Sequence, residues 1–321
     1  MLLSHAAKFI GSLGLEGASA VRARTERRRL DGYRAEGCRR VMLTLNGTDY
    51  RLCLLDTNAV SEIVKRPEQL RHFLTWSLDS QPSFIASFSL FTLLELRRKP
   101  DVYRQFVELF RVVPCMILKS HEQLLEEETR CYPDPSAIDP TLVAITALGS
   151  DGNDLAKVST VVFGDEFILD RERLWNESQG EIVEGISSLV PNYPPAGDKY
   201  TRSEVRSFVQ IAAFSQLAMR AHDFAERIVQ KDETVDIDAF PSLKITTYTV
   251  FHKFYADRVR KSRSSDAFDI IISAVTPYVD AIVTEGEQAE SLRKTKRHDD
   301  FIRHLLVYTE KDFRHSTPSR A

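Results

Sequence analysis

Four acidic side chains stand at positions where a carboxylate usually needs a partner: Asp56, Glu95, Asp269 and Glu285. Asp56 follows the short apolar run 52–55, and Glu285 ends a second apolar run. Glu95 lies on an otherwise apolar helical face, and Asp269 directly precedes three isoleucines. Carboxylates that pack together cannot all stay ionised without a compensating cation, so these residues favour a hard divalent ion such as Mg²⁺ or Mn²⁺.

A divalent ion held by carboxylates can activate water and stabilise the leaving oxygen of a phosphodiester. We therefore predict that Asp56, Glu95 and Asp269 are catalytic metal ligands for one or two such ions. Glu285 would complete the site as a fourth catalytic ligand. The structural alternatives are a helix cap for Asp56, an ion pair with an arginine for Glu95 and a solvated strand end for Glu285. Asp266, the competing acid in the first helical turn before Asp269, is a candidate supporting residue, with a helix-dipole partner as the alternative.

Polar and basic residues beside these acids supply the expected supporting groups. Thr57, Asn58 and Thr284 would orient the carboxylates or bound water, with helix capping as the alternative. The residues predicted to contact a phosphate are Arg97, Arg98 and Lys261. Exposed basic residues are usually only solvated, so the prediction depends on their repeated placement next to the acidic motifs.

The acids can meet only if the two strands that lead to Asp56 and Glu285 end side by side in a parallel sheet. A continuous apolar run such as 52–55 is typical of a strand buried on both faces. Its end at Asp-Thr-Asn favours a turn and a helix cap, and Pro67 stops the helix that follows. Asp56 would then stand at the carboxyl end of a central strand, where open α/β sheets place their ligands. Further strands are predicted at 41–45, 83–87, 112–118 and 280–284, and helices at 89–98, 101–111, 120–130 and 266–275.

A change in composition divides the chain. Prolines crowd residues 131–140 and recur at 191–195, and long helical patterns cover 203–230 and 243–260. We predict a flexible N-terminal extension at 1–40, a first core part at 41–130, a mainly helical insertion at 131–261, a second core part at 262–315 and a tail at 316–321.

Overall composition is that of an ordinary globular protein. The chain has 321 residues, 43% apolar residues and a net charge of −3, so it can bury a sizeable core but is not a polycation. Its four cysteines show no metal-binding or disulfide spacing, which predicts reduced thiols and a cytoplasmic location. No apolar run is long enough for a membrane span, and neither a Gly-rich phosphate loop nor a Ser-His-Asp order is present.

At the acidic motifs the chain resembles the PIN-domain nucleases. Leu55-Asp56-Thr57-Asn58 looks like their first motif, and Ser89-x-x-Thr92-x-x-Glu95 resembles their second. Asp269 with the aliphatic residues after it is similar to the third, and Val283-Thr284-Glu285 resembles the fourth. The resemblance covers about half of the chain, roughly 50–130 and 262–313. Glu285 departs from the Asp or Asn usual in the family, and the long insertion departs from the size of its toxin members.

The resemblance implies a three-layer α/β/α sandwich around a parallel sheet, an acidic metal site and cleavage of RNA. The leading prediction is a Mg²⁺- or Mn²⁺-dependent endoribonuclease, that is, a hydrolase that binds RNA. The alternatives are a non-catalytic PIN-fold binding module and a structure-specific DNA nuclease. The similarity to the toxins of bacterial toxin–antitoxin pairs implies an inhibitory or regulatory protein partner. The sequence does not decide whether the chain forms a homodimer, and no membrane partner is expected.

Overall fold

The computed structural model describes most of the two predicted core parts and much of the segment between them. The described residues are 43–45, 48–111, 113–145, 200–230, 235–256, 263 and 265–312, with isolated helical positions between 155 and 186. The predicted extension 1–40, the tail 316–321 and the phosphate contact assigned to Lys261 lie outside them.

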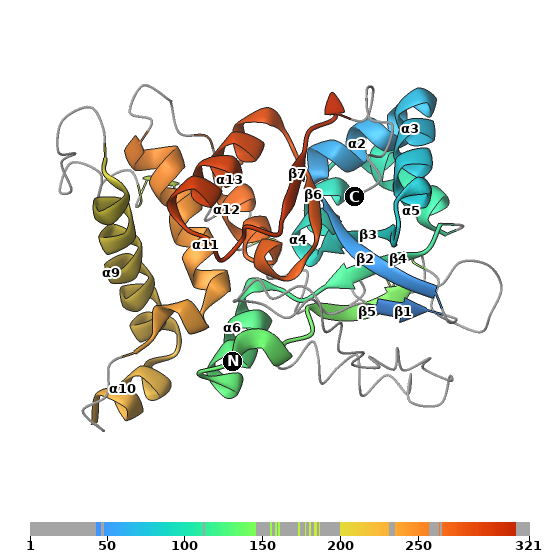
Figure 1. Cartoon of the computed structure of the whole chain (residues 1–321). Coiled ribbons are helices and arrows are strands. Elements are labelled where there is room, and N and C mark those ends of the chain that lie inside the picture. Colours follow the sequence, from blue (N-terminus) through green and yellow to red (C-terminus); the bar gives the residue numbers. More distant parts are fainter. Residues whose placement is uncertain are drawn as a thin grey trace.

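A mixed sheet lies in one half of the molecule, and strand β2 is an interior strand of this sheet (Figure 1). The strand order is β5-β4-β3-β2-β6-β7, and β1 pairs separately with β2. The strands are β1 (Leu43–Leu45), β2 (Thr48–Leu55), β3 (Ser83–Ser89), β4 (Cys115–Leu118), β5 (Thr141–Ile145), β6 (Ala281–Val283) and β7 (Leu306–Tyr308). The predicted strand 52–55 is therefore confirmed as the central strand.

The sheet is not wholly parallel, which corrects the prediction. Strands β4, β3, β2, β6 and β7 run parallel to their neighbours in that order. The outer strand β5 runs antiparallel to β4, and β1 runs antiparallel to the first residues of β2. Strand β1 lies within the strand predicted at 41–45. Both antiparallel strands lie outside the five-strand parallel block that carries the acidic motifs.

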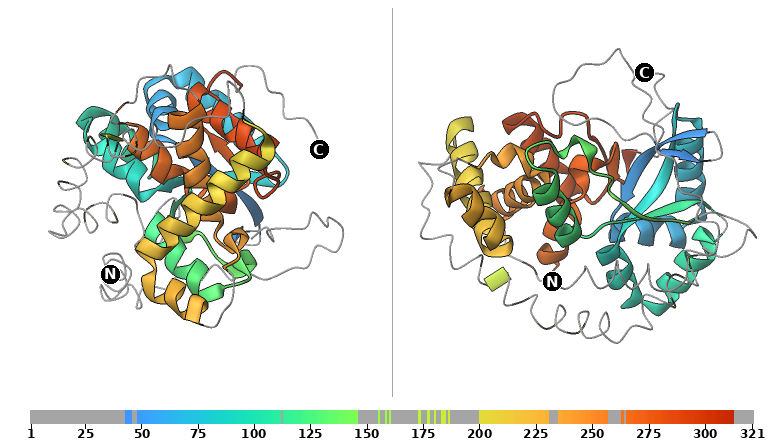
Figure 2. Two further views of the ribbon diagram at one scale, coloured as in Figure 1. Left: turned by 90° about the vertical axis from the view of Figure 1, so that its left-hand side faces the viewer. Right: turned by 90° about the horizontal axis from the view of Figure 1, so that it is seen from below.

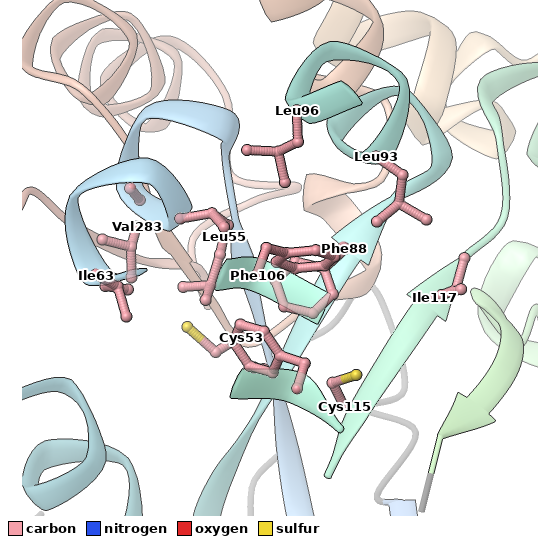
Figure 3. Close-up of a cluster of buried hydrophobic side chains, with 14 of the residues drawn as sticks. Cys53, Leu55, Ile63, Phe88, Leu93, Leu96, Phe106, Cys115, Ile117 and Val283 are labelled. Atoms are coloured by element: carbon pink, nitrogen blue, oxygen red, sulfur yellow. The ribbon is translucent and has the colours of Figure 1, made fainter. Parts of the chain in front are cut away.

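Both faces of β2 are buried, which explains its unbroken apolar run. Cys53 and Leu55 point to one face, where they pack with Ile63, Phe106 and Val283 (Figure 3). The helices on this face are α2 (Thr57–Lys65), α3 (Pro67–Asp79), α4 (Leu90–Arg97) and α5 (Pro100–Phe110). Alternation along a strand sends Leu52 and Leu54 to the opposite face, into a second apolar cluster.

Helices from both halves of the chain cover that second face. They are α6 (His121–Cys131), α11 (Pro241–Val250), α12 (Asp266–Ser273) and α13 (Gly286–His298). Ile245 of α11 is fully buried in the same cluster as Leu54 and Ile272. Helices therefore lie on both sides of a central sheet, which is compatible with the expected three layers.

The predicted insertion 131–261 contributes directly to the core. Its β5 is a strand of the sheet, whereas the sequence analysis predicted mainly helix there, and its α11 packs beneath the sheet. The remainder that the structure describes includes α9 (Arg202–Arg220), α10 (His222–Gln230) and a π-helix, η4 (Phe251–Ala256). Helices α9 and α10 lie at the end of the molecule away from the sheet (Figures 1 and 2). The single helix predicted at 203–230 is divided into α9 and α10 at Ala221.

Helix α9 is held to the body of the protein by two arginines. The Nε atoms of Arg202 and Arg206 donate hydrogen bonds to the carbonyl of His298 at 2.8 and 3.1 Å. His298 is the last residue of α13, so both cations lie at the negative end of that helix.

In the part of the chain that is described, no helix is both long enough and apolar enough to cross a membrane.

Candidate functional site

Two neighbouring strands bring Asp56 and Glu285 together at the carboxyl end of the parallel sheet. Asp56 follows β2 and Glu285 follows Thr284 after β6, and Leu55 is paired with Val283 in the sheet register. Asp56 is the N-cap of α2, where its Oδ1 accepts from the amide of Ala59 at 2.7 Å. Its Oδ2 accepts from the Thr284 hydroxyl and, at 3.2 Å, from the Glu285 amide. The carboxylate of Asp56 thus caps helix α2 and also stands at the carboxyl end of the parallel sheet.

The environment of Asp56 makes its negative charge costly. Burial, with a smaller contribution from the nearby charge of Asp269, raises the pKa of this carboxyl to about 7. The hydrogen bonds from Ala59, Thr284 and Glu285 act in the opposite direction. A carboxyl with this pKa is largely protonated below neutral pH unless a cation compensates its charge.

The two residues directly after Asp56 donate hydrogen bonds to two of the other acids, Glu95 and Glu285. The hydroxyl of Thr57 donates to Oε2 of Glu95 at 2.5 Å, which joins the start of α2 to α4. The side-chain amide of Asn58 donates to Oε2 of Glu285 at 3.0 Å. The Asp-Thr-Asn sequence thus contacts both glutamates through its second and third residues.

Asp269 lies within electrostatic reach of the other three acids. Burial is the main cause of the raised pKa values of Glu95 and Glu285, and the charge of Asp269 contributes to both, as it does for Asp56. The four acids predicted from the sequence therefore gather in one region, although they come from α4, α12 and the ends of β2 and β6.

Sequence reasoning missed one member of this region, Lys253. Its Nζ lies 2.5 Å from Oδ2 of Asp269 and 3.3 Å from Oδ1 of Asp266. Only 4% of the lysine side chain is exposed, and Asp266 is fully buried. The signal was present in the sequence, because Lys253 interrupts the aromatic run Phe251–Tyr255 in the same way that Glu95 interrupts an apolar helix. Asp266 also accepts from the amide of Arg263 at 2.8 Å.

The acids supply the donor atoms that a hard divalent ion prefers. In this structure, however, hydrogen bonds and a lysine compensate their negative charges. Carboxylate and hydroxyl oxygens are the ligands that Mg²⁺ and Mn²⁺ prefer. Among the described residues, however, no group of three or more His, Cys, Asp or Glu side chains is arranged to hold a metal ion. Hydrogen bonds from Thr57, Asn58 and Thr284, together with the ammonium of Lys253, compensate the carboxylates instead.

Basic residues border the acids on the α4 side. Arg98 is exposed, and its guanidinium lies 4.8 Å from the ring centroid of Phe268 in α12. The charges of Arg98 and Lys99 oppose the rise in the pKa of Glu95, which places both cations near that carboxylate. Arg97 is half-buried in the last turn of α4. Arg98, one of the predicted phosphate contacts, therefore lies near Glu95.

Comparison with known proteins found no matching family model, no matching curated protein and no matching solved structure.

Proposed function

We propose that this protein is a metal-dependent endoribonuclease with a PIN-like core. The observation that carries the proposal is that Asp56 and Glu285 lie together at the carboxyl ends of two adjacent parallel strands. Glu95 is hydrogen-bonded to Thr57 beside them, and the charge of Asp269 acts on all three acids. Open α/β sheets place their ligands at this edge, and perturbed pKa values cluster at functional sites. The parallel block β4-β3-β2-β6-β7, with helices on both faces, agrees with the three-layer arrangement that the PIN resemblance implies.

The proposed ligands are Asp56, Glu95, Asp269 and Glu285. A divalent ion would supply activation of water and stabilisation of the leaving oxygen. The protein contributes orientation: Ala59 and Thr284 fix the Asp56 carboxylate, and Thr57 fixes Glu95. Arg98 offers a positive charge to a phosphate at the border of the acids.

The test is cleavage of single-stranded RNA in the presence of Mn²⁺ by wild type and by Asp56→Asn. The asparagine keeps an oxygen for the helix cap but removes the negative charge, so we expect activity to fall on the order of 100-fold or more. Asp236→Asn is the matched control, because Asp236 caps the 3-10 turn Ile237–Ala239 through the same kind of bond and is exposed. Equal RNA cleavage by Asp56→Asn and wild type would remove the proposal. Parallel assays on flap and single-stranded DNA test the DNA-nuclease alternative.

A non-catalytic PIN-fold binding module is the second candidate, and Lys253 is the observation that favours it. Its ammonium already balances Asp266 and Asp269 without a metal ion. Calorimetry with Mn²⁺ separates the two functions. A binding module takes up no Mn²⁺, retains a bound RNA or protein without divalent ions, and shows no turnover.

A further inference from the structure

Lys253 is buried at the acidic site although it belongs to a segment that carries none of the acidic motifs. Lysine is rarely buried unless its charge is paired, and here the pairing is with two carboxylates. Its neighbours Phe251, Phe254 and Tyr255 belong to an apolar cluster that also contains Ala267 of α12. The Lys253 side chain is therefore part of the packed interior of the protein.

Packing of α11 against α12 fixes where this lysine points. The hydroxyl of Thr249 donates to the hydroxyl of Ser273 at 3.2 Å, which joins the last turn of α11 to the end of α12. The chain then continues directly into the π-helix Phe251–Ala256. Lys253 is the third residue of this π-helix, and such segments are frequent at functional sites. Its Nζ reaches the first turn of α12, where it contacts Asp266 and Asp269.

The positive charge of Lys253 also acts beyond its two direct partners. It opposes the rise in the pKa of Glu285, so the ammonium also lies within electrostatic reach of that carboxylate. One fixed cation thus influences acids from both α12 and the end of β6.

We propose that Lys253 is a positioning residue that serves as the built-in counter-ion of the acidic site and thereby sets its affinity for a divalent cation. The inference rests on the proposed function, since it concerns the same carboxylates. In the absence of a metal ion, the ammonium holds Asp266 and Asp269 in place. When a divalent ion approaches, the same ammonium repels it and competes for Asp269.

The repulsion is large enough to outweigh any loss of orientation. At an effective dielectric constant of about 20, a unit charge within about 5 Å of a divalent ion changes its binding constant by well over tenfold. Asp269 is carried by a packed helix, so its backbone position does not depend on the lysine. Removal of the positive charge should therefore strengthen metal binding.

The experiment measures Mn²⁺ binding by calorimetry and thermal unfolding with and without Mn²⁺. Lys253→Met should lower the Kd for Mn²⁺ at least about tenfold and increase the Mn²⁺-induced rise in Tm relative to wild type. Lys253→Arg keeps the charge and should stay close to wild type. Lys253→Gln keeps a hydrogen-bond donor for the carboxylates, so it gives the same reading if the methionine variant does not fold.

Lys244→Met is the matched control. Lys244 lies on α11, is 5% exposed and is also paired with two carboxylates, Asp238 and Asp299. Its loss should destabilise the protein equally with and without Mn²⁺, because these partners are not acids of the site. A general effect of losing a buried lysine is thereby separated from an effect on the acidic site.

Each outcome decides the inference separately from the proposed function. If wild type and Lys253→Gln bind Mn²⁺ equally, or if the variant binds more weakly, Lys253 does not set the affinity, while the nuclease proposal stands. If only the variants bind Mn²⁺, the counter-ion role is supported and the metal-dependent activity of the wild type is refuted. If none of the proteins binds Mn²⁺, both proposals are overturned.

Discussion

Glu128 provides a quantitative test of how burial controls charge in this fold. This glutamate of α6 is fully buried, and its Oε1 accepts from the Ser242 amide at 2.8 Å and from the Tyr278 hydroxyl at 2.5 Å. Its Oε2 accepts from the Ser242 hydroxyl at 2.6 Å. Burial raises the pKa of Glu128 from 4.5 to about 7, against the opposing effect of these hydrogen bonds.

The sign of the pH dependence follows from the raised pKa. Between the two pKa values the folded protein keeps the proton of Glu128 while the unfolded chain has lost it. The folded state then binds more protons, so the free energy of unfolding decreases as the pH rises through this window. At about 1.4 kcal/mol per pH unit, the full window corresponds to roughly 3 kcal/mol lost at and above neutral pH.

Glu128→Gln should remove this contribution. Glutamine keeps an oxygen that accepts from the Ser242 amide and from Tyr278, and its amide group can donate to the Ser242 hydroxyl. We expect the variant to be more stable than wild type at about pH 8, with a smaller advantage at about pH 5. Other buried acids, including Asp56, contribute to the slope in both proteins and cancel in the comparison.

Urea unfolding across this pH range, with a chelator present, measures the effect. Glu126→Gln is the control, because Glu126 lies on the same helix and is exposed. Parallel stability–pH curves for wild type and Glu128→Gln would refute the reasoning, since they would mean that Glu128 titrates alike in the folded and unfolded chains.

Two further predictions concern the core and the acidic site. Leu54→Ala should lower the free energy of unfolding by about 2–5 kcal/mol in urea unfolding, because Leu54 is fully buried in the apolar cluster beneath the sheet; Leu78→Ala, at a residue 64% exposed, should change it by no more than about 0.5 kcal/mol. Thr284→Val removes a hydrogen bond that lowers the pKa of Asp56, so NMR titration of the Asp56 carboxyl should show a pKa above about 7, and an unchanged or lower value would contradict the assigned contact.

The sequence predicted the elements whose signals are local. Side chains alternate between the two faces of a strand, and every residue of the run before Asp56 is apolar. This pattern predicts a strand buried on both faces, and both faces of β2 are covered. Ser89 was expected to start a helix, and its hydroxyl accepts from the amide of Phe91. The order of the acidic motifs predicted a common sheet edge, and the charge of Asp269 acts on all three other acids.

The remaining features depend on contacts that no local pattern encodes. Strand β5 (Thr141–Ile145) has a strand-like composition, but the prolines before it made it look like part of the insertion, and only its pairing with β4 places it in the sheet. A charge within the aromatic run Phe251–Tyr255 indicates that Lys253 is buried, but the sequence does not show that its partners are Asp266 and Asp269 of α12. The distinction between a metal site and an internally compensated one also depends on this lysine.

The central position of β2 has a consequence for how the protein is made. This strand is paired on one side with β3, about 30 residues later, and on the other with β6, more than 200 residues later. Strand β1 can cover the first residues of β2 early, but the edge at Cys53–Leu55 stays open during synthesis until residues 281–283 have emerged, and open edges invite pairing with other chains. The acidic site can therefore assemble only after β6 has joined the sheet.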